Sequence, residues 1–513
     1  MKFTRQRKRE ATRNTIPFPV LLKESGAAPE RHSVRQMVNS AKGAFMVLPL
    51  FAATVVVLSA QTFQTLYSFG GQSGVNPLAG LIQAQDGELY GATTLISAGY
   101  DGTLFKITTS AKLTTLDRFC DRSGCPAGAG PEAAPIQTPS GDLYGTTSLG
   151  GAYGEGTVYR MTPDGTLTTL YSFCAQSGCA DGAGADAGLL PGPDGAFYGA
   201  TVMGGAYGTV GLFGTGGTIF KITPDGMLTT LYSFCAQSGC ADGSSVDSEL
   251  VWGADGELYG TTNSGGAYNQ GTIFKITPSG TLTTLYSFCA QSGCPDGSSP
   301  IAGLVQAANG DLYGTTFLGG ASNSGTLFKI TPGGALSTLV SFCAACPVGW
   351  GPAATLIQAT DGALYGTTSG NGYGVGAVFK LAPNGTLTTL HSFPGGGGPQ
   401  AGLVQDTNGV FYGTTFGGGV QGVGSVFSLS VGLGPFVAPQ TTWGKVGESV
   451  KILGTNLTDA SRVTFNGAAA QFTVNEAGAA ISATVPAGAS TGSIEVSTPI
   501  GTLSSNVPFR VLP

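Results

Sequence analysis

One short strand step, a tyrosine that follows Leu or Phe and precedes a glycine, returns seven times along the chain and constrains its fold more than any other feature; we call it the Tyr-Gly step. The gaps between successive copies are 54, 54, 61, 54, 52 and 47 residues. A period of about 50 residues built from short strand-like runs is typical of propellers and related arrays. The period therefore predicts one repeated β unit. The tyrosines of the step are Tyr90, Tyr144, Tyr198, Tyr259, Tyr313, Tyr365 and Tyr412.

Each copy of the repeat contains four strand-like runs, which are clearest in residues 248–288. The runs SELVWG, ELYGTT, GTIFKIT and LTTLYSF alternate apolar or aromatic residues with Thr, Lys and Ser, as half-buried strands do. Ala-Asp-Gly and Pro-Ser-Gly form tight turns between them, and the other two connections are longer. Each copy is thus predicted to be a four-stranded antiparallel sheet.

The two ends of the repeat region predict how the array closes. An outer-strand run, QTLYSF at 64–69, precedes every other strand, whereas the last copy ends at Ser430 without one. We expect the N-terminal strand to complete the seventh unit, because pairing removes an exposed edge. The predicted fold is all-β: a seven-bladed β-propeller over residues 61–430, closed by an N-terminal strand. An open solenoid is the alternative, and it would leave these ends unmatched.

Residues 1–60 have the layout of a basic extension followed by a secretory signal peptide. Residues 1–42 hold 10 of the 23 Lys and Arg residues, the 18 residues from Gly43 to Ala60 carry no charge, and small residues precede a cleavage point after Ala60. Met37 is an alternative start. An uncleaved membrane anchor is the other interpretation, because 18 apolar residues are just long enough to span. We expect export through the Sec pathway to the cell surface or the medium, with membrane contact only through this segment.

The remainder of the chain is acidic, with 13 basic and 26 acidic residues after residue 42. Nucleic-acid binding requires a basic patch or stripe. We therefore expect no nucleic-acid partner.

Two resemblances to known families agree with this interpretation. The sub-motifs DGELYGTT, GGAY, GTIFKITPSG and LTTLYSF resemble the GloVer (Gloeo_Verruco) tandem repeat of secreted bacterial proteins, over residues 62–430. That resemblance implies an exported repeat protein and brings no activity. Residues 435–513 resemble an IPT/TIG domain in Gly447–Leu457, in Val-Thr-Phe-Asn-Gly at 463–467, and in Val485-Pro486 before Thr491-Gly492. This resemblance implies an immunoglobulin-like β-sandwich, which agrees with about 80 residues of short strands.

Ten cysteines form five closely spaced pairs, all placed just after the outer strand of the repeat. An even number in an exported chain predicts five local disulfides that stiffen loops. Closing so short a loop is worth roughly 2 kcal/mol. Metal binding would need four converging ligands, and the chain has only two histidines, so we expect neither metal nor cofactor. The predicted pairs are Cys120–Cys125, Cys174–Cys179, Cys235–Cys240, Cys289–Cys294 and Cys343–Cys346.

The topology of a four-stranded blade places the cysteine loops and the Gly-Gly-Ala-Tyr loops on one face. Loops on a rigid scaffold are common binding sites. A tyrosine ring offers apolar area while its hydroxyl keeps a hydrogen bond, which suits a glycan or an envelope protein. The alternative is that these tyrosines only pack between neighbouring loops. The candidate ligand-binding residues are Tyr153, Tyr207, Tyr268 and Tyr373, with Asp181, Asp242 and Asp296 close by.

No catalytic constellation is visible, so we predict a non-catalytic binding or surface-interaction protein. The aspartates that precede Gly in tight turns are expected to be structural; they are Asp86, Asp164, Asp194, Asp225, Asp255 and Asp361. His391 replaces a strand tyrosine. One alternative is a structural spacer in a surface layer. Another is a carbohydrate-active enzyme, which would need a non-repeated acidic pair about 5 to 10 Å apart at the channel mouth. The off-pattern carboxylates, none with a visible partner, are Glu132, Glu155, Asp247 and Glu249.

Overall fold

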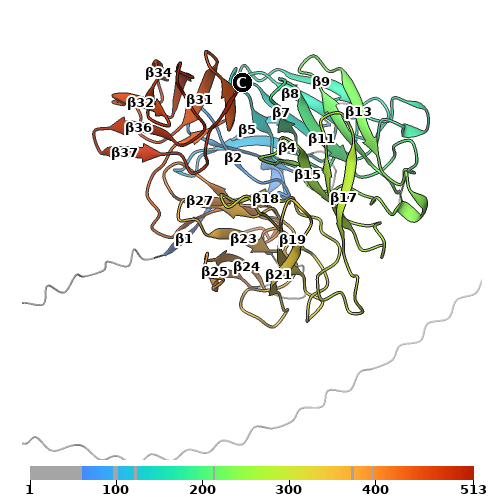
Figure 1. Ribbon diagram of the computed structural model, residues 1–513. Coiled ribbons are helices and arrows are strands. Elements are labelled where there is room, and N and C mark those ends of the chain that lie inside the picture. The colour runs from blue at the N-terminus through green and yellow to red at the C-terminus, as the bar shows by residue number, and fades with distance from the viewer. Residues whose placement is uncertain (1–60, 96–101, 121–123, 212–213, 371–374, 395–396) are drawn as a thin grey trace, which may run out of the picture. The chain divides into compact units, whose positions relative to one another are not determined.

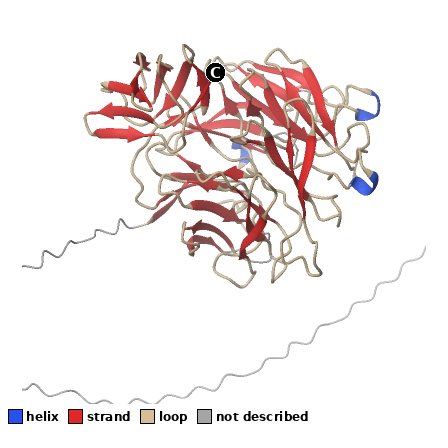
Figure 2. Ribbon diagram, in the orientation of Figure 1, coloured by secondary structure: helices blue, strands red, loops and turns tan. Residues whose placement is uncertain are grey.

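The computed structural model describes residues 61–95, 102–120, 124–211, 214–370, 375–394 and 397–513. The chain divides into two units, Met1–Val57 and Leu58–Pro513, and all described residues lie in the second. The predicted signal peptide, the Met37 start and Tyr373 lie outside the described residues. Strands dominate the described part, and its helices are three single turns, η1 (Gly71–Ser73), η2 (Ser177–Cys179) and η3 (Ser238–Cys240) (Figure 2).

Between Thr62 and Ser430 the described residues form seven four-stranded antiparallel sheets, an arrangement consistent with propeller-like blades. We number them sheets 1 to 7 by the chain order of their first, two-residue strand. Sheet 1 contains β2 (Ile82–Gln83), β3 (Leu89–Thr93), β4 (Thr103–Ile107) and β5 (Leu113–Arg118). Sheet 2 contains β6 (Ile136–Gln137), β7 (Leu143–Thr147), β8 (Thr157–Met161) and β9 (Leu167–Ser172). Sheet 3 contains β10 (Leu190–Pro191), β11 (Phe197–Thr201), β12 (Thr218–Ile222) and β13 (Leu228–Ser233).

The remaining sheets repeat the same order of strands. Sheet 4 contains β14 (Val251–Trp252), β15 (Leu258–Thr262), β16 (Thr272–Ile276) and β17 (Leu282–Ser287). Sheet 5 contains β18 (Val305–Gln306), β19 (Leu312–Thr316), β20 (Thr326–Ile330) and β21 (Leu336–Ser341). Sheet 6 contains β22 (Ile357–Gln358), β23 (Leu364–Thr368), β24 (Gly376–Leu381) and β25 (Leu387–Phe393). Sheet 7 contains β26 (Val404–Gln405), β27 (Phe411–Thr415), β28 (Ser425–Ser430) and β1 (Thr62–Ser68).

Sheet 7 takes its outer strand from the start of the repeat region. Strand β1 pairs antiparallel with β28, from Thr62 opposite Ser430 to Ser68 opposite Ser425. In Figure 1 the blue β1 lies beside the orange strands of the sheet that includes β27. Sheets 7 and 1 are also joined by hydrogen bonds. The Thr414 hydroxyl donates to the Ala79 carbonyl at 3.0 Å, and the Thr407 amide donates to Gln83 Oε1 at 3.0 Å.

The Tyr-Gly step has a packing explanation. In sheet 4, the Tyr259 hydroxyl donates to Asp255 Oδ2 at 2.7 Å, which joins the second strand to the preceding Asp-Gly turn. A Cβ atom on Gly260 would lie 2.6 Å from Cζ of Phe274, the fully buried aromatic residue opposite it on β16. Only glycine leaves room for that ring, because a Cβ contact this short forces the neighbouring side chain to move. The repeated motif thus encodes the core of each sheet.

The C-terminal segment folds into two further four-stranded sheets and a two-stranded one. The first four-stranded sheet contains β29 (Ala438–Pro439), β31 (Ser449–Leu453), β35 (Ala480–Thr484) and β34 (Phe472–Val474). The second contains β33 (Ala468–Ala469), β32 (Arg462–Phe465), β36 (Ile494–Thr498) and β37 (Gly501–Ser504). Strands β30 (Trp443–Lys445) and β38 (Arg510–Leu512) pair in parallel. Ile452 and Ile481 of the first sheet share one buried core with Val463 and Val496 of the second. The two larger sheets therefore pack against each other.

Candidate functional site

Three tyrosines at the same place in successive repeats are held exposed; we call Tyr153, Tyr207 and Tyr268 the tyrosine rim. Their exposed fractions are 56%, 62% and 51%. Each stands nine residues after the Tyr-Gly tyrosine of its sheet (153 − 144, 207 − 198 and 268 − 259), in the loop between the second and third strands of sheets 2, 3 and 4. More than half of each side chain thus remains available to a partner.

The loops that carry the rim are tied to the preceding cysteine loops. The amides of Gly151, Gly205 and Gly266 donate to the carbonyls of Cys125, Cys179 and Cys240, each at 2.9 Å. The two loops approach each other closely. At Gly150, which has φ +75°, a Cβ atom would lie 2.8 Å from the Cys125 carbonyl oxygen. Glycine is needed there for both the backbone conformation and the contact. Each rim tyrosine therefore stands on a loop anchored by backbone hydrogen bonds.

The neighbouring aspartates organise the next cysteine loop. In sheet 2, Asp181 is fully buried. It accepts hydrogen bonds from the Tyr171 hydroxyl at 2.8 Å, the Ala175 amide at 2.9 Å and the Gln176 amide at 3.1 Å. Burial, followed by the hydrogen bond to Asp181, raises the pKa of Tyr171, so the hydroxyl stays protonated and keeps donating.

The same arrangement returns in the next two repeats. Asp242 is fully buried and accepts from Tyr232, Ala236 and Gln237, and Asp296 accepts from the Tyr286 hydroxyl and the Cys289 amide, both at 2.9 Å. Sequence analysis placed Asp181, Asp242 and Asp296 beside the ligand. The structure places them beneath the loops as supports, and direct contact with a ligand stays a prediction for them.

All five predicted cysteine pairs are bonded as expected: Cys120–Cys125, Cys174–Cys179, Cys235–Cys240, Cys289–Cys294 and Cys343–Cys346. Each disulfide lies in the connection that follows an outer strand. Since the rim glycines donate to cysteine carbonyls, these loops support the rim.

The rim occupies only part of the repeat array. Ser322 in sheet 5 and Gln421 in sheet 7 stand where the rim tyrosines would be. The fourth predicted tyrosine, Tyr373, lies outside the described residues. Within the described residues the rim therefore comes from sheets 2, 3 and 4.

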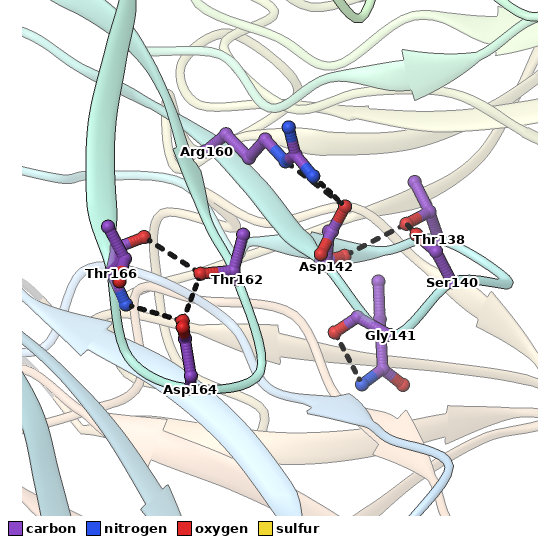
Figure 3. Close-up of polar contacts among 9 residues, drawn as sticks. Thr138, Ser140, Gly141, Asp142, Arg160, Thr162, Asp164 and Thr166 are labelled. Atoms are coloured by element: carbon purple, nitrogen blue, oxygen red, sulfur yellow. Dashed lines mark hydrogen bonds and ion pairs between the residues drawn. The ribbon is translucent and has the colours of Figure 1, made fainter.

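The turn carboxylates are structural, as Figure 3 shows for sheet 2. Asp164 Oδ1 accepts from the Thr166 amide at 3.1 Å and from the Thr162 hydroxyl. These hydrogen bonds, led by the one from Thr162, lower the pKa of Asp164 and keep it ionised. In the adjoining turn, Asp142 Oδ2 pairs with Arg160 through Nη2 at 2.7 Å and Nε at 3.0 Å.

Three of the four off-pattern carboxylates meet in one cavity. Glu132, Asp247 and Glu249 line a cavity of about 400 Å³ together with Asp186, which the sequence analysis missed. A usable signal was present: Glu132, Asp186 and Asp247 each stand 12 residues before the Tyr-Gly tyrosine of their sheet (144 − 132, 198 − 186 and 259 − 247). Aligning the repeats on those tyrosines would have placed the three at one level.

The fourth off-pattern carboxylate and the histidine are elsewhere. Glu155 is not among the cavity-lining residues, and its backbone carbonyl accepts from the Gly184 amide. His391 lies on β25, with its ring stacked 3.5 Å from that of Phe63, and burial lowers its pKa. This placement agrees with its interpretation as a strand residue. Among the described residues, no group of three or more His, Cys, Asp or Glu side chains is arranged to hold a metal ion.

One protein-family model matches this chain. The model of the Gloeobacter/Verrucomicrobia repeat matches residues 50–213, 122–304 and 292–471, which together span most of the chain. The protein belongs to this repeat family, as its sub-motifs predicted. Among curated proteins none matches. Within the described residues no helix is both long and apolar enough to cross a membrane.

Several solved structures are similar at low identity. One is a fungal alcohol oxidase of the AA5 family in complex with copper, at 11% identity and TM-score 0.47, covering 87% of this chain and 99% of that one. Another is the periplasmic gluconolactonase of Pseudomonas aeruginosa, at 17% identity and TM-score 0.42, covering 69% and 96%. A putative 6-phosphogluconolactonase from Bacteroides uniformis matches at 17% identity and TM-score 0.39, covering 62% and 85%.

Proposed function

We propose that this chain is an exported, non-catalytic binding protein whose tyrosine rim holds a glycan chain of a cell envelope. The observation that carries the proposal is the repetition of Tyr153, Tyr207 and Tyr268, each more than half exposed, on equivalent loops of three successive sheets. A sugar ring can pack its C–H face on a tyrosine while the phenol hydroxyl and nearby backbone groups take up its hydroxyls. Repeated tyrosines match a polymer of repeated units.

The anchored loops favour affinity. Ordering a flexible loop on binding opposes association by about 0.5–1.5 kcal/mol for each immobilised side chain. The rim loops are already held by the glycine-to-cysteine hydrogen bonds and by the disulfide loops on either side. Beneath the rim, the Asp181 and Asp242 carboxylates are buried and hydrogen-bonded, which supports a binding role over catalysis there.

The architecture we propose is a seven-bladed β-propeller closed by β1 and followed by an immunoglobulin-like β-sandwich of the IPT/TIG type. The pairing of β1 with β28 and the bond from Thr414 to Ala79 support closure. The shared core of the two C-terminal sheets supports the sandwich. Five disulfides fit an extracellular protein, since such bonds persist in oxidising compartments.

The test is binding of the mature chain, from Gln61, to a glycan array and to isolated cell walls. A variant with Tyr153→Ala, Tyr207→Ala and Tyr268→Ala should lose the bound glycan, at about 5- to 10-fold in affinity for each ring. Met227→Ala is the matched control, because Met227 is 68% exposed in the turn between β12 and β13. A hit that the triple variant retains in full would refute the rim as the site.

A further inference from the structure

The acidic cavity is a second candidate site, separate from the rim. Segments of all seven sheets line it, and its residues fall into two levels when the repeats are aligned on the Tyr-Gly tyrosine. The upper level, 12 residues before that tyrosine, holds three acids on successive sheets, a glutamine, and apolar residues on the other sheets. In order from sheet 1 to sheet 7 these residues are Leu78, Glu132, Asp186, Asp247, Ile301, Ala353 and Gln400.

The lower level, two residues further along each sheet, is narrow. A Cβ atom on Gly303 would lie 3.0 Å from the Glu249 carbonyl oxygen, and one on Gly402 would lie 3.0 Å from the Thr355 carbonyl oxygen. Glu249 is the one acid among the seven residues of this level. Its carboxylate reaches over sheet 3, since a Cβ atom on Gly188 would lie 2.6 Å from Glu249 Oε1. The four acids therefore line one side of the cavity, on sheets 2, 3 and 4.

Two of the upper acids have a polar partner within their own sheet, and the third has none. Asp247 Oδ2 accepts from Asn263 Nδ2 at 2.9 Å, and Ser148 lies beside Glu132, with its hydroxyl donating to the Gly130 carbonyl at 2.9 Å. Ser148 and Asn263 stand four residues after the Tyr-Gly tyrosine, and in sheet 3 that position is Val202. The surroundings are apolar: a Cβ atom on Gly184 would lie 3.6 Å from Asp186 Oδ1, 3.5 Å from Met203 Cε and 3.9 Å from Val202 Cβ.

Asp186 therefore has no polar side chain at the place where its two neighbours have one. No hydrogen bond to its carboxyl is present among the described residues. Asp186 is only partly buried, so the donor that its carboxyl lacks must come from whatever enters the cavity. Burial, with the nearby charges of Glu132 and Asp247, raises the pKa of Asp186 well above its usual range. Burial likewise raises the pKa of Asp247, to about 7.

The cavity-lining residues that the structure describes include no Lys, Arg or His. The countercharge must then be a proton or a ligand. The described carboxyls are not arranged for a metal ion, and the other sheets present the apolar residues Leu78, Ile301 and Ala353 together with Gln400. Pockets of a few hundred Å³ hold small molecules. We propose that this cavity binds a small primary ammonium compound with a compact apolar body, with Asp186 as its counter-ion.

The chemistry of binding follows from the cluster. An ammonium group carries three N–H donors, so one can bond Asp186 while the others donate to further acceptors that line the cavity. When the cation enters, carboxyls that hold protons in the empty cavity release them. Binding is therefore accompanied by proton release to the buffer near neutral pH.

The test is isothermal titration of the mature chain at pH 7 with n-butylamine, in phosphate and in Tris buffer. We expect saturable binding whose heat differs between the two buffers because protons are released. Asp186→Asn should weaken it by about tenfold or more. Val202→Asn, which offers Asp186 the kind of partner that Asn263 offers Asp247, should weaken it while keeping the carboxylate. Asp164→Asn, on an exposed turn, is the control, and thermal unfolding checks that each variant is folded.

Several outcomes would overturn the proposal. If uncharged 1-pentanol bound as tightly as n-butylamine, the cavity would recognise only the apolar body of the compound and not its ammonium group. If calcium chloride displaced n-butylamine at a concentration below that of the amine, the cavity would be a metal site. If n-butylamine did not bind to the wild type, the proposed site would be wrong. If it bound to Asp186→Asn and to Val202→Asn as well as to the wild type, Asp186 would not be its counter-ion. The triple rim variant should bind the amine normally, and loss there would place the amine on the rim.

Discussion

Replacing Asp247 by asparagine tests whether the cavity carboxyls weaken the fold above neutral pH. Asp247 lines the cavity, and burial raises its pKa to about 7, although the hydrogen bond from Asn263 opposes the shift. An aspartate in an unfolded chain has a pKa of about 3.9. Between these values the native state keeps a proton that the unfolded chain has already released. The amide introduced by Asp247→Asn would accept the same bond from Asn263 and would never ionise.

The sign and size of the effect follow by linkage. The native pKa is raised, so the stability contributed by this proton is fully present below about pH 4 and is lost as the pH rises through about 7. A difference of about three pKa units corresponds to about 4 kcal/mol at 1.36 kcal/mol per unit. This is an upper figure, because the Asp247 side chain is only half-buried beside the cavity and its titration is linked to that of Glu132.

The assay is urea unfolding with the disulfides intact, for the wild type and for Asp247→Asn, at pH 5 and at pH 8. From pH 5 to pH 8, the free energy of unfolding of the variant should rise by a few kcal/mol relative to that of the wild type. Asp164→Asn should show no such gain, because hydrogen bonds lower the pKa of Asp164. A difference between variant and wild type that is the same at both pH values would refute the reasoning.

Three further predictions concern the fold. Gly260→Ala should destabilise the protein by about 1–3 kcal/mol in urea unfolding, because its Cβ would overlap the Phe274 ring, and adding Phe274→Leu should recover part of the loss. Deleting residues 61–69 should lower the midpoint of thermal unfolding, because it removes the fully buried Phe69, and should promote aggregation, because it exposes the edge of β28. Unchanged thermal unfolding and light scattering would contradict this. Replacing Cys235 and Cys240 by serine should leave far-ultraviolet circular dichroism intact but raise hydrogen exchange in that cysteine loop and in the rim loop bonded to it, at about 2 kcal/mol of stability; a global loss of structure would disprove the local role of this disulfide.

The sequence was informative wherever the repeat itself carries the structure. Four strands per copy, the cysteine pairing and the role of turn residues such as Asp164 all follow from patterns within one copy. The extra strand at 64–69 also predicted the partner of β28, because the two ends of the repeat differ by one strand.

The acidic cavity was not predicted, for a physical reason. Glu132, Asp186 and Asp247 are separated by 54 and 61 residues, and they meet only because separate sheets turn their first strands to a common space. A pattern within one copy carries no information about that meeting. Asp186 was not among the predicted candidates, and Val202, at the position of Ser148 and Asn263, is what distinguishes it in the structure.

The pairing of β1 with β28 has a consequence for the order of assembly. Thr62 lies opposite Ser430, so the first strand to be synthesised must wait for nearly all of the repeat region before its partner exists. Contacts between such distant residues slow folding, because a long loop must close before the contact forms. Until then β1 is a free strand and the last sheet has an open edge, both of which can pair with another copy. We therefore expect the pairing of β1 with β28 to be the slowest folding step and the one most exposed to aggregation.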